Sequence, residues 1–284
     1  MKSYFGNKLK LKDVTYKHIE DYYTYLRTER KNKNVTIKHH AVILSPALRM
    51  AYRDDLIPKN PYEFVSKLKR EKSKRNHYNV DELEELFKHT DKTKIGLAVR
   101  VAAFYGFRRS EVLGLKWNAI DLSQKTITIQ HKVIVDKKIV YAKDKLKTKA
   151  SNRTLPLFPE IERLLLNRKA EIEHNKYLFG KSYNHQFEDY VFVDDDGKLI
   201  YPDYISKTFA KIIKKNKMKY ITYHDLRHSC ASLLAANNVS MKHIQEWLGH
   251  ANFNTTADTK NRRAYQSIVR RNFLKKSVTG VLTI

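Results

Sequence analysis

The segment from Lys67 to His77 carries six basic side chains and a single large apolar one, Leu68. So much charge and so little apolar surface exclude it from a hydrophobic core, so it predicts a linker between two separately folded units. We therefore expect a helical domain at residues 1–66, a basic linker at 67–77 and a larger domain at 78–284. The linker either contacts a polyanion or is a solvated loop that touches nothing. Its candidate contacts are Lys67, Lys69, Arg70, Lys72, Lys74 and Arg75.

The first 65 residues have the apolar spacing of helices. After Asp13, a residue type that caps helix N-termini, apolar residues recur at helical spacing: Ile19, Tyr22, Tyr23 and Leu26. A second helix is expected over 36–53, where Pro46 should kink it or divide it in two, because proline cannot donate the helical hydrogen bond. Pro58 and Pro61 end the unit.

In the larger domain the apolar spacing changes from helical to alternating and back. Asn79 can cap a helix that runs to about His89, and residues 95–105 are apolar almost all round, as in a buried helix. Short β-branched runs separated by polar turns predict a small antiparallel sheet from 126–129, 133–135 and 139–141. Further helices are expected at 159–173, 202–216, 223–236 and 240–248. The predicted fold class is mainly α with a small antiparallel β-sheet (α+β).

The charge of the chain indicates a polyanionic partner. Lys and Arg number 56 against 30 Asp and Glu, a formal net charge of +26. Solubility alone needs less charge than this, so nucleic acid is the favoured partner over a merely soluble basic surface. A basic amphipathic anchor of the kind that binds membrane surfaces is not found.

Cysteine usage and hydropathy place the chain in a reducing compartment. Cys230 is the single cysteine, which excludes an intrachain disulfide, and its apolar neighbours predict that it is buried. The sequence contains no run of about 18 apolar residues and no signal-peptide core at its start. We expect a cytoplasmic protein.

Two motifs near the C-terminus predict a phosphate site. His224 and Arg227 are three residues apart on an expected helix, so their side chains share a face and can reach one anion. His250 directly follows Gly249, a natural helix-ending residue, and imidazole can exchange a proton near neutral pH. Each histidine alone is more often structural, so the signal lies in the combined spacing.

These residues and two upstream blocks resemble tyrosine recombinases, the phage and transposon integrase family. That family combines an arginine block, a lysine-bearing hairpin, His-x-x-Arg, Leu-Gly-His and a nucleophilic tyrosine. The corresponding stretches are GFRRSEVLGLKW at 106–117, KTKASNRTLP at 147–156, YHDLRH at 223–228 and WLGH at 247–250. The resemblance spans roughly residues 90–260 and implies a helical core-binding domain followed by a mixed catalytic domain. The leading helix of that first domain is not found in the sequence, so we expect the domain to be shortened.

The resemblance implies a catalytic role for five residues: Arg108, Lys147, His224, Arg227 and His250. Two arginines would hold the non-bridging oxygens of a DNA phosphate, because planar guanidinium groups bind such oxygens strongly and with fixed orientation. His224 and His250 would bond the same phosphate, and Lys147 would protonate the leaving 5′ oxygen. No metal or cofactor is implied.

Each assignment has a simpler alternative. Arg108 could form only a helix-end ion pair with Glu111, and Glu111 either orients a catalytic group or is an exposed carboxylate near the helix start. Lys147 could contact only the DNA backbone, and Lys145 and Lys149 are its rivals; Lys149 is also a candidate DNA contact. We assign the neighbouring Asp225 and His228 either to packing or to supporting the site residues, and His243 to the surface.

The position of the nucleophile departs from the family. Counting from Leu248-Gly249-His250, the family tyrosine would fall at 260, where this chain has lysine. Lysine cannot form a phosphotyrosine, so Lys260 predicts a chain that binds DNA and is impaired in cutting it. Tyr265 is the alternative nucleophile, although it lies more than a helical turn further on.

The resemblance also implies partners and a setting. A homotetramer would act on two duplex DNA sites in a bacterial cell, at the nucleoid, with a possible accessory directionality factor and no membrane. The rival functions are a topoisomerase of type IB, which the Leu-Gly-His block disfavours, and a non-catalytic DNA-binding protein on the same scaffold.

Overall fold

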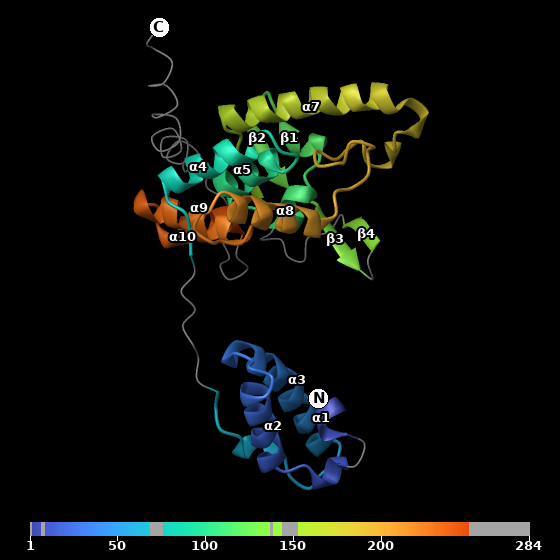
Figure 1. Cartoon of the computed structure of the whole chain (residues 1–284), viewed down its shortest axis with the longest axis vertical. Helices are drawn as coiled ribbons and strands as arrows, with labels where there is room; N and C mark the ends of the chain where they lie inside the picture. The colour runs from blue at the N-terminus through green and yellow to red at the C-terminus, as the bar shows by residue number, and fades with distance from the viewer. Residues whose placement is uncertain (1, 7–8, 69–75, 137–138, 144–152, 250–284) are drawn as a thin grey trace. The chain divides into compact units, whose positions relative to one another are not determined.

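The computed structural model describes residues 2–6, 9–68, 76–136, 139–143 and 153–249. The chain divides into two compact units, Met1–Lys74 and Arg75–Ile284, whose helices and strands are labelled in Figure 1. Each unit has its own hydrophobic core. No helix within the described residues is both long and apolar enough to cross a membrane. The fold is mainly helical with small antiparallel sheets, as the sequence predicts.

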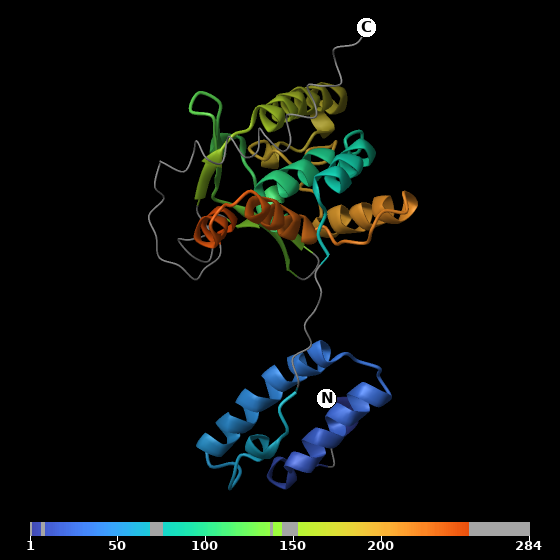
Figure 2. The same ribbon diagram turned by 90° about the vertical axis from the view of Figure 1, so that its left-hand side faces the viewer.

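The first unit is built on two long helices, α2 (Tyr16–Thr28) and α3 (Asn34–Arg53), which lie side by side in Figures 1 and 2. A single helical turn, α1 (Lys2–Phe5), precedes them, and short 3-10 helices lie at Leu11–Asp13 and Pro61–Phe64. The four residues predicted to form the apolar face of α2 are all buried: Ile19, Tyr22, Tyr23 and Leu26.

The structure corrects two local predictions in this unit, the cap of α2 and the division of α3 at Pro46. The cap of α2 is Thr15, whose hydroxyl accepts from the backbone N–H of His18, while Asp13 ends the preceding 3-10 helix. Helix α3 runs through Pro46 without a break. Its inward residues on both sides of the proline, Ile37 and Leu48, are buried in one core, and this packing keeps the helix continuous.

The second unit is organised around α5 (Gly96–Tyr105), which is buried along almost its whole length. The helices packed against α5 are α4 (Val80–Thr90), α6 (Arg109–Leu113), α7 (Pro159–Phe179) and α9 (Asp225–Ala236). Helix α8 (Pro202–Lys215) contacts α4 and α6, and α10 (Met241–Leu248) packs on α9. Further 3-10 helices lie at Trp117–Ala119, Gly180–Ser182 and His185–Phe187. Asn79 caps α4 through the backbone N–H of Glu82, as predicted.

The strands form two sheets, so the single sheet predicted from three consecutive runs is wrong. Strand β2 (Thr126–Ile129) lies between β1 (Ile120–Asp121) and β5 (Arg153–Pro156), with Ile129 opposite Arg153. Strands β3 (Lys132–Asp136) and β4 (Ile139–Lys143) form a separate hairpin. The alternation of residues shows which faces are buried but not which strand is the neighbour, and here the partner of β2 comes from more than twenty residues away.

Helix boundaries also differ from the sequence prediction, including the start of α3, which lies at Asn34 instead of 36. Helix α7 extends to Phe179 instead of ending at 173, and α9 begins at Asp225 instead of 223. His224 is therefore the capping residue of α9, with a helical backbone, and it still precedes Arg227 by three positions.

Candidate phosphate-binding site

The site begins at the turn between α5 and α6. Helix α5 ends at Gly106, whose φ of 64° lies in the left-handed region that only glycine adopts without strain. A Cβ at this position would stand 2.3 Å from Cδ2 of Leu248, the last residue of α10. Glycine here lets the end of α10 pack directly against the turn that carries Arg108.

Glu111 joins two arginines at the start of α6. Its Oε1 accepts from Nη1 of Arg108 at 2.6 Å, and its Oε2 accepts from Nη2 of Arg153 at 3.0 Å. The backbone N–H of Arg108 also donates to Oε2, at 3.0 Å, so the carboxylate closes the capping box of the helix. The side chains of Glu111 and Arg153 are 4% and 6% exposed, whereas Arg108 is 37% exposed. The ion pair between Arg108 and Glu111, given above as one alternative, is therefore present. Glu111 is buried, so the alternative of an exposed carboxylate is wrong.

The charges around Glu111 keep it ionised. Burial acts to raise the pKa of this carboxyl, but the charge of Arg153 and the hydrogen bonds from Arg108 and Arg153 hold it below its ordinary value. Burial also lowers the pKa of Arg153, which nonetheless stays protonated beside its carboxylate partner.

Arg227 is buried at the junction of α5, α9 and α10. Its Nη1 donates to the carbonyl of Gly106 at 2.6 Å, and its Nη2 donates to the carbonyl of Leu248. Nη2 of Arg108 lies 3.4 Å from the carbonyl of Gly249, the next residue. The two arginines therefore meet at the two residues that directly precede His250.

The cluster has more positive than negative charge. Burial, followed by the charges of Arg108 and Arg153, lowers the pKa of Arg227 to about 10, so it stays protonated at neutral pH. Among the described residues, one carboxylate directly contacts this cluster: Glu111, which is bonded to Arg108 and Arg153. A partly buried cluster of this kind favours an anion that accepts several hydrogen bonds at once.

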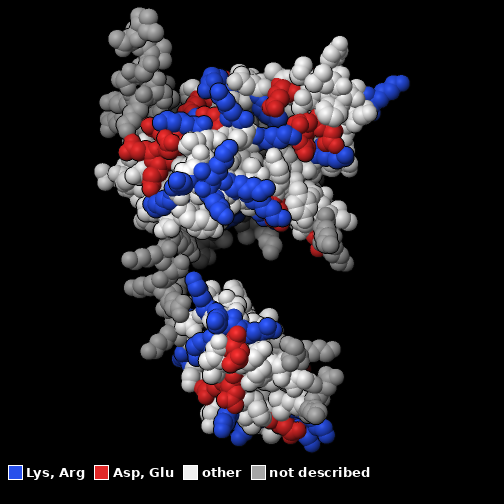
Figure 3. All heavy atoms as spheres, viewed as in Figure 1, with Lys and Arg blue, Asp and Glu red and all other residues white. Residues whose placement is uncertain are grey.

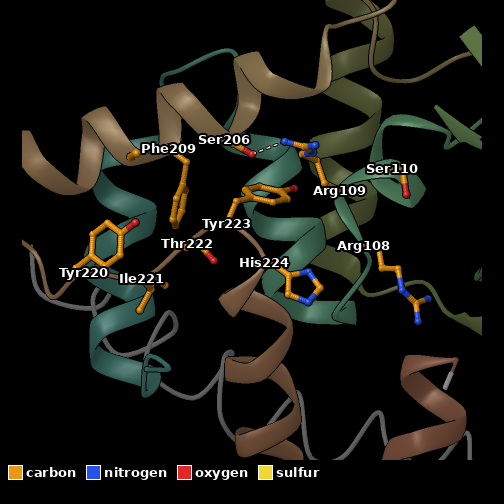
Figure 4. Close-up of a pocket in the computed structure, with 11 residues that line it drawn as sticks. Arg108, Arg109, Ser110, Ser206, Phe209, Tyr220, Ile221, Thr222, Tyr223 and His224 are labelled. Carbon is orange, nitrogen blue, oxygen red and sulfur yellow. Dashed lines mark hydrogen bonds between the residues drawn. The ribbon is translucent and has the colours of Figure 1, made fainter. Parts of the chain in front are cut away.

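A hollow of about 470 Å³ opens beside this cluster. Arg108 and His224 both line it, together with residues of α8 and of the segment before α9 (Figure 4). Arg108 and the adjacent Arg109 diverge, since Arg109 reaches Ser206 of α8 with a hydrogen bond of 2.7 Å. The ring of His224 is exposed and lies edge-on to that of His228, 5.6 Å between centroids.

Exposed lysines continue along α8, which forms one wall of the hollow. Figure 3 shows Lys and Arg side chains gathered on this face of the second unit. The exposed lysines of α8 are Lys207, Lys211, Lys214 and Lys215. This surface can attract a polyanion to the hollow from a distance.

Several sequence-predicted residues lie outside the described residues. These are Lys69, Arg70, Lys72, Lys74, Arg75, Lys145, Lys147, Lys149, His250, Lys260 and Tyr265. Of the predicted linker contacts the structure describes Lys67, which is exposed. The three predicted catalytic residues that are described, Arg108, His224 and Arg227, lie around the start of α6 and the start of α9.

The sequence interpretation missed Arg153. It stands in the lysine-bearing block, where the predicted chemistry belongs to the lysines. The available signal was alternation, because Arg153 and Leu155 share the inward face of β5. A charged residue at an inward position requires a buried countercharge, and that countercharge is Glu111.

Comparison with protein families matches both units. Residues 76–264 match the model described as "Phage integrase family", and residues 1–73 match the "Phage integrase SAM-like domain". A XerC-like tyrosine recombinase of Caldanaerobacter subterraneus subsp. tengcongensis is 32% identical over 54% of this chain and 41% of its own length. The transposase of transposon Tn916 from Enterococcus faecalis is 29% identical over 78% of this chain and 56% of its own length. The chain thus spans about half the length of these two relatives.

Solved structures share the fold. The Tn1549 transposon integrase in complex with circular intermediate DNA superposes with a TM-score of 0.71 at 18% identity, over 90% of this chain and 86% of that one. A λ integrase dimer bound to a core site gives a TM-score of 0.64 at 18% identity, over 91% and 81% of the two chains.

Proposed function

Because this chain belongs to the phage integrase family, we propose that it acts in site-specific DNA recombination and that its phosphate site lies at the junction of α5, α6, α9 and α10. The observation that carries the proposal is a cluster of three guanidinium groups beside an open hollow, two of them bonded to the buried carboxylate of Glu111 and the third to backbone carbonyls. A scissile phosphate would supply the anion that this cluster favours.

Within this proposal Arg108 and Arg227 bind the non-bridging oxygens. During cleavage, negative charge develops on these oxygens as a tyrosine phenolate attacks phosphorus and the 5′ oxygen leaves. His224 and His250 would add hydrogen bonds to the same phosphate, and Lys147 would give its proton to the 5′ oxygen. Arg227 is held by two backbone carbonyls, which fix the direction of its guanidinium.

The proposed limitation of this chain is its nucleophile. Cleavage in the family forms a bond between phosphorus and tyrosine as the bond between phosphorus and the 5′ oxygen breaks. Lys260 stands where that tyrosine is expected, so we propose a chain that binds and positions the phosphate without cutting it. Tyr265 is the remaining candidate nucleophile nearby.

The proposed partner is duplex DNA, which would also place the protein at the nucleoid. The net charge of +26 and the exposed lysines of α8 support it. One solved structure with a similar fold is a λ integrase tetramer bound to a Holliday junction. We propose the same stoichiometry on two sites here, with an accessory directionality factor as a possible addition. We also propose DNA contacts from Lys149 and from the basic linker, through Lys67, Lys69, Arg70, Lys72, Lys74 and Arg75.

The decisive test restores the tyrosine. The substrate is a duplex that the protein selects from a random-sequence pool. It carries a nick near the scissile phosphate, so the cut fragment diffuses away and any covalent adduct between protein and DNA is trapped. We expect no adduct with the unchanged chain and an adduct that survives denaturant with Lys260→Tyr. Lys260→Phe is the matched control, because it supplies the ring without the hydroxyl and should form none.

Other outcomes would change the assignment. An adduct with the unchanged chain that disappears in Tyr265→Phe would make Tyr265 the nucleophile. If Lys260→Tyr binds the selected duplex and forms no adduct, then the proposed cleavage site is wrong. The second candidate function, a DNA-binding protein that kept the scaffold without the chemistry, rests on Lys260 itself and would then be favoured.

A further inference from the structure

Arg153 is fixed by three elements of the second unit. It lies on β5 opposite Ile129 of β2, and its guanidinium carbon stands 5.2 Å from the centre of the Phe107 ring. Its Nη2 donates to Glu111 of α6 at 3.0 Å. A cation over an aromatic face and against a carboxylate, with 6% of its side chain exposed, has little freedom to move.

Arg108, in contrast, depends on Glu111 for its orientation. Its guanidinium has a short contact to Oε1 of Glu111, at 2.6 Å, and a long one to the carbonyl of Gly249, at 3.4 Å. Both oxygens of Glu111 are used, one toward each arginine. The direction of the Arg108 side chain is therefore set by a carboxylate whose Oε2 is held by two donors, the guanidinium of Arg153 and the backbone N–H of Arg108.

The charge balance adds a second effect. Arg108 and Glu111 alone would sum to zero, and a neutral pair attracts a phosphate only weakly. With Arg153 included, these three side chains carry two positive charges and one negative charge, a net charge of +1 to which Arg227 adds its own. Since Arg153 is buried, the surplus positive charge faces the hollow through Arg108.

We propose that Arg153 is a positioning residue for DNA cleavage: through Glu111 it orients the guanidinium of Arg108 and leaves its charge available for the scissile phosphate. The inference rests on the proposed function. The simpler alternative is that Arg153 only neutralises a buried carboxylate, which would affect the stability of the protein and not the chemistry in particular.

The experiment uses the full Lys260→Tyr chain and two nicked substrates of the selected sequence. One has the natural scissile phosphate, and the other has a methylphosphonate, in which a methyl group replaces one non-bridging oxygen and removes its charge. Single-turnover cleavage is measured for Arg153→Met, which is similar in length and uncharged, and for Arg153→Lys, which keeps the charge. Arg100→Met is the matched control, since Arg100 forms its ion pairs with Asp91 and Glu160 instead of Glu111.

On the natural phosphate, we expect Arg153→Met to slow cleavage about 100-fold and Arg153→Lys to recover most of that loss. On the methylphosphonate, the loss in Arg153→Met should shrink to about 10-fold or less, because Arg108 has less charge to stabilise. An equal loss on both substrates would show a structural role only and overturn the inference. For Arg100→Met, the cleavage rate relative to the Lys260→Tyr parent should be the same on the two substrates.

Two further results are informative. If Arg153→Met does not fold, Arg153→Lys takes its place, because lysine keeps the charge but not the planar guanidinium geometry. The inference then requires that the smaller loss of cleavage rate in Arg153→Lys is smaller still on the methylphosphonate than on the natural phosphate. If Lys260→Tyr forms no adduct on either substrate, the proposed function fails and this inference fails with it. An adduct accompanied by equal losses removes the positioning role alone.

Discussion

Glu111 shows how one buried carboxylate can organise several cations. A carboxylate at 4% exposure would lose much of its hydration free energy, and hydrogen bonds from two guanidinium groups offset that loss. The same hydrogen bonds keep the carboxylate charged and both arginines in place. The three side chains of Arg108, Glu111 and Arg153 therefore act as one connected ionic group, in which each holds the others in place.

Removing the charge of Glu111 should have a pH-dependent cost. The pKa of Glu111 is lowered in the folded protein, so its ionisation stabilises the fold above its ordinary value of 4.5, and this contribution is lost as pH falls further. Glu111→Gln should lower the free energy of unfolding by about 2 to 3 kcal/mol at pH 7. The difference from the unchanged chain should narrow as pH falls below about 4.5.

Urea unfolding at a series of pH values checks this prediction. Glu171→Gln is the matched control, because Glu171 bonds Arg168 with its side chain 55% exposed, and we expect a change of less than about 1 kcal/mol at any pH. A difference between Glu111→Gln and the unchanged chain that stays constant with pH would contradict the assigned ionisation.

At the scale of elements, the site depends on how closely α10 approaches the turn after α5. Gly106 makes this approach possible, and the carbonyls at the end of α10 then reach Arg227 and Arg108. Cys230 of α9 is buried under the same contact, and burial raises the pKa of its thiol to about 12. This thiol can therefore report on the packing of α9 against its neighbours.

Gly106→Ala should displace α10. The new Cβ would collide with Leu248 and would also require a left-handed backbone, so we expect a loss of about 2 kcal/mol or more in the free energy of unfolding. Alkylation of Cys230 by iodoacetamide at pH 8, slow in the unchanged chain, should become faster. Cleavage in the Lys260→Tyr background should fall as the carbonyl of Leu248 moves from Arg227.

Gly180→Ala separates collision from backbone strain. Gly180 also has a positive φ, of 50°, but no atom lies within 4 Å of the position its Cβ would take. This variant should lose stability through strain alone and leave the alkylation rate of Cys230 unchanged. Faster alkylation in both variants would mean that the thiol reports a general loss of stability and not the displacement of α10.

For the chain as a whole, charge would govern the encounter with the proposed DNA partner. The net charge of +26 is far from what solubility requires, and part of it lies on α8, which forms a wall of the hollow. Each lysine that neutralises a DNA phosphate releases a bound counterion, so the affinity depends on salt concentration.

Duplex binding should therefore weaken steeply with salt. For about 6 to 10 phosphate contacts, the affinity should fall by about 10³ to 10⁵ between about 50 and 200 mM salt, measured by fluorescence anisotropy. Lys211→Gln should reduce the slope of log affinity against log salt by about 1. Lys169→Gln is the control, because this exposed lysine belongs to α7, which does not line the hollow. Equal slopes for both variants would exclude α8 from the interface.

The order of residues along the chain was enough to predict most helices and to locate the motifs that carry the chemistry. Apolar spacing is a local property, so it predicted α2, α4, α5 and α10 closely, and the charge balance and ordered motifs indicated the family. Local competition set the details it missed: Thr15 caps α2 in place of Asp13, and core packing carries α3 through Pro46.

Which distant residues meet depends on how the elements pack in three dimensions. Strand β2 takes β5 as its neighbour, and this pairing brings Arg153 to Glu111, 42 positions away in the chain. The turn at Gly106 likewise brings the carbonyls at the end of α10 to Arg108 and Arg227. Such contacts result from packing among many elements together, and no spacing within a single segment records them, because periodicity shows which face is buried but not what covers it.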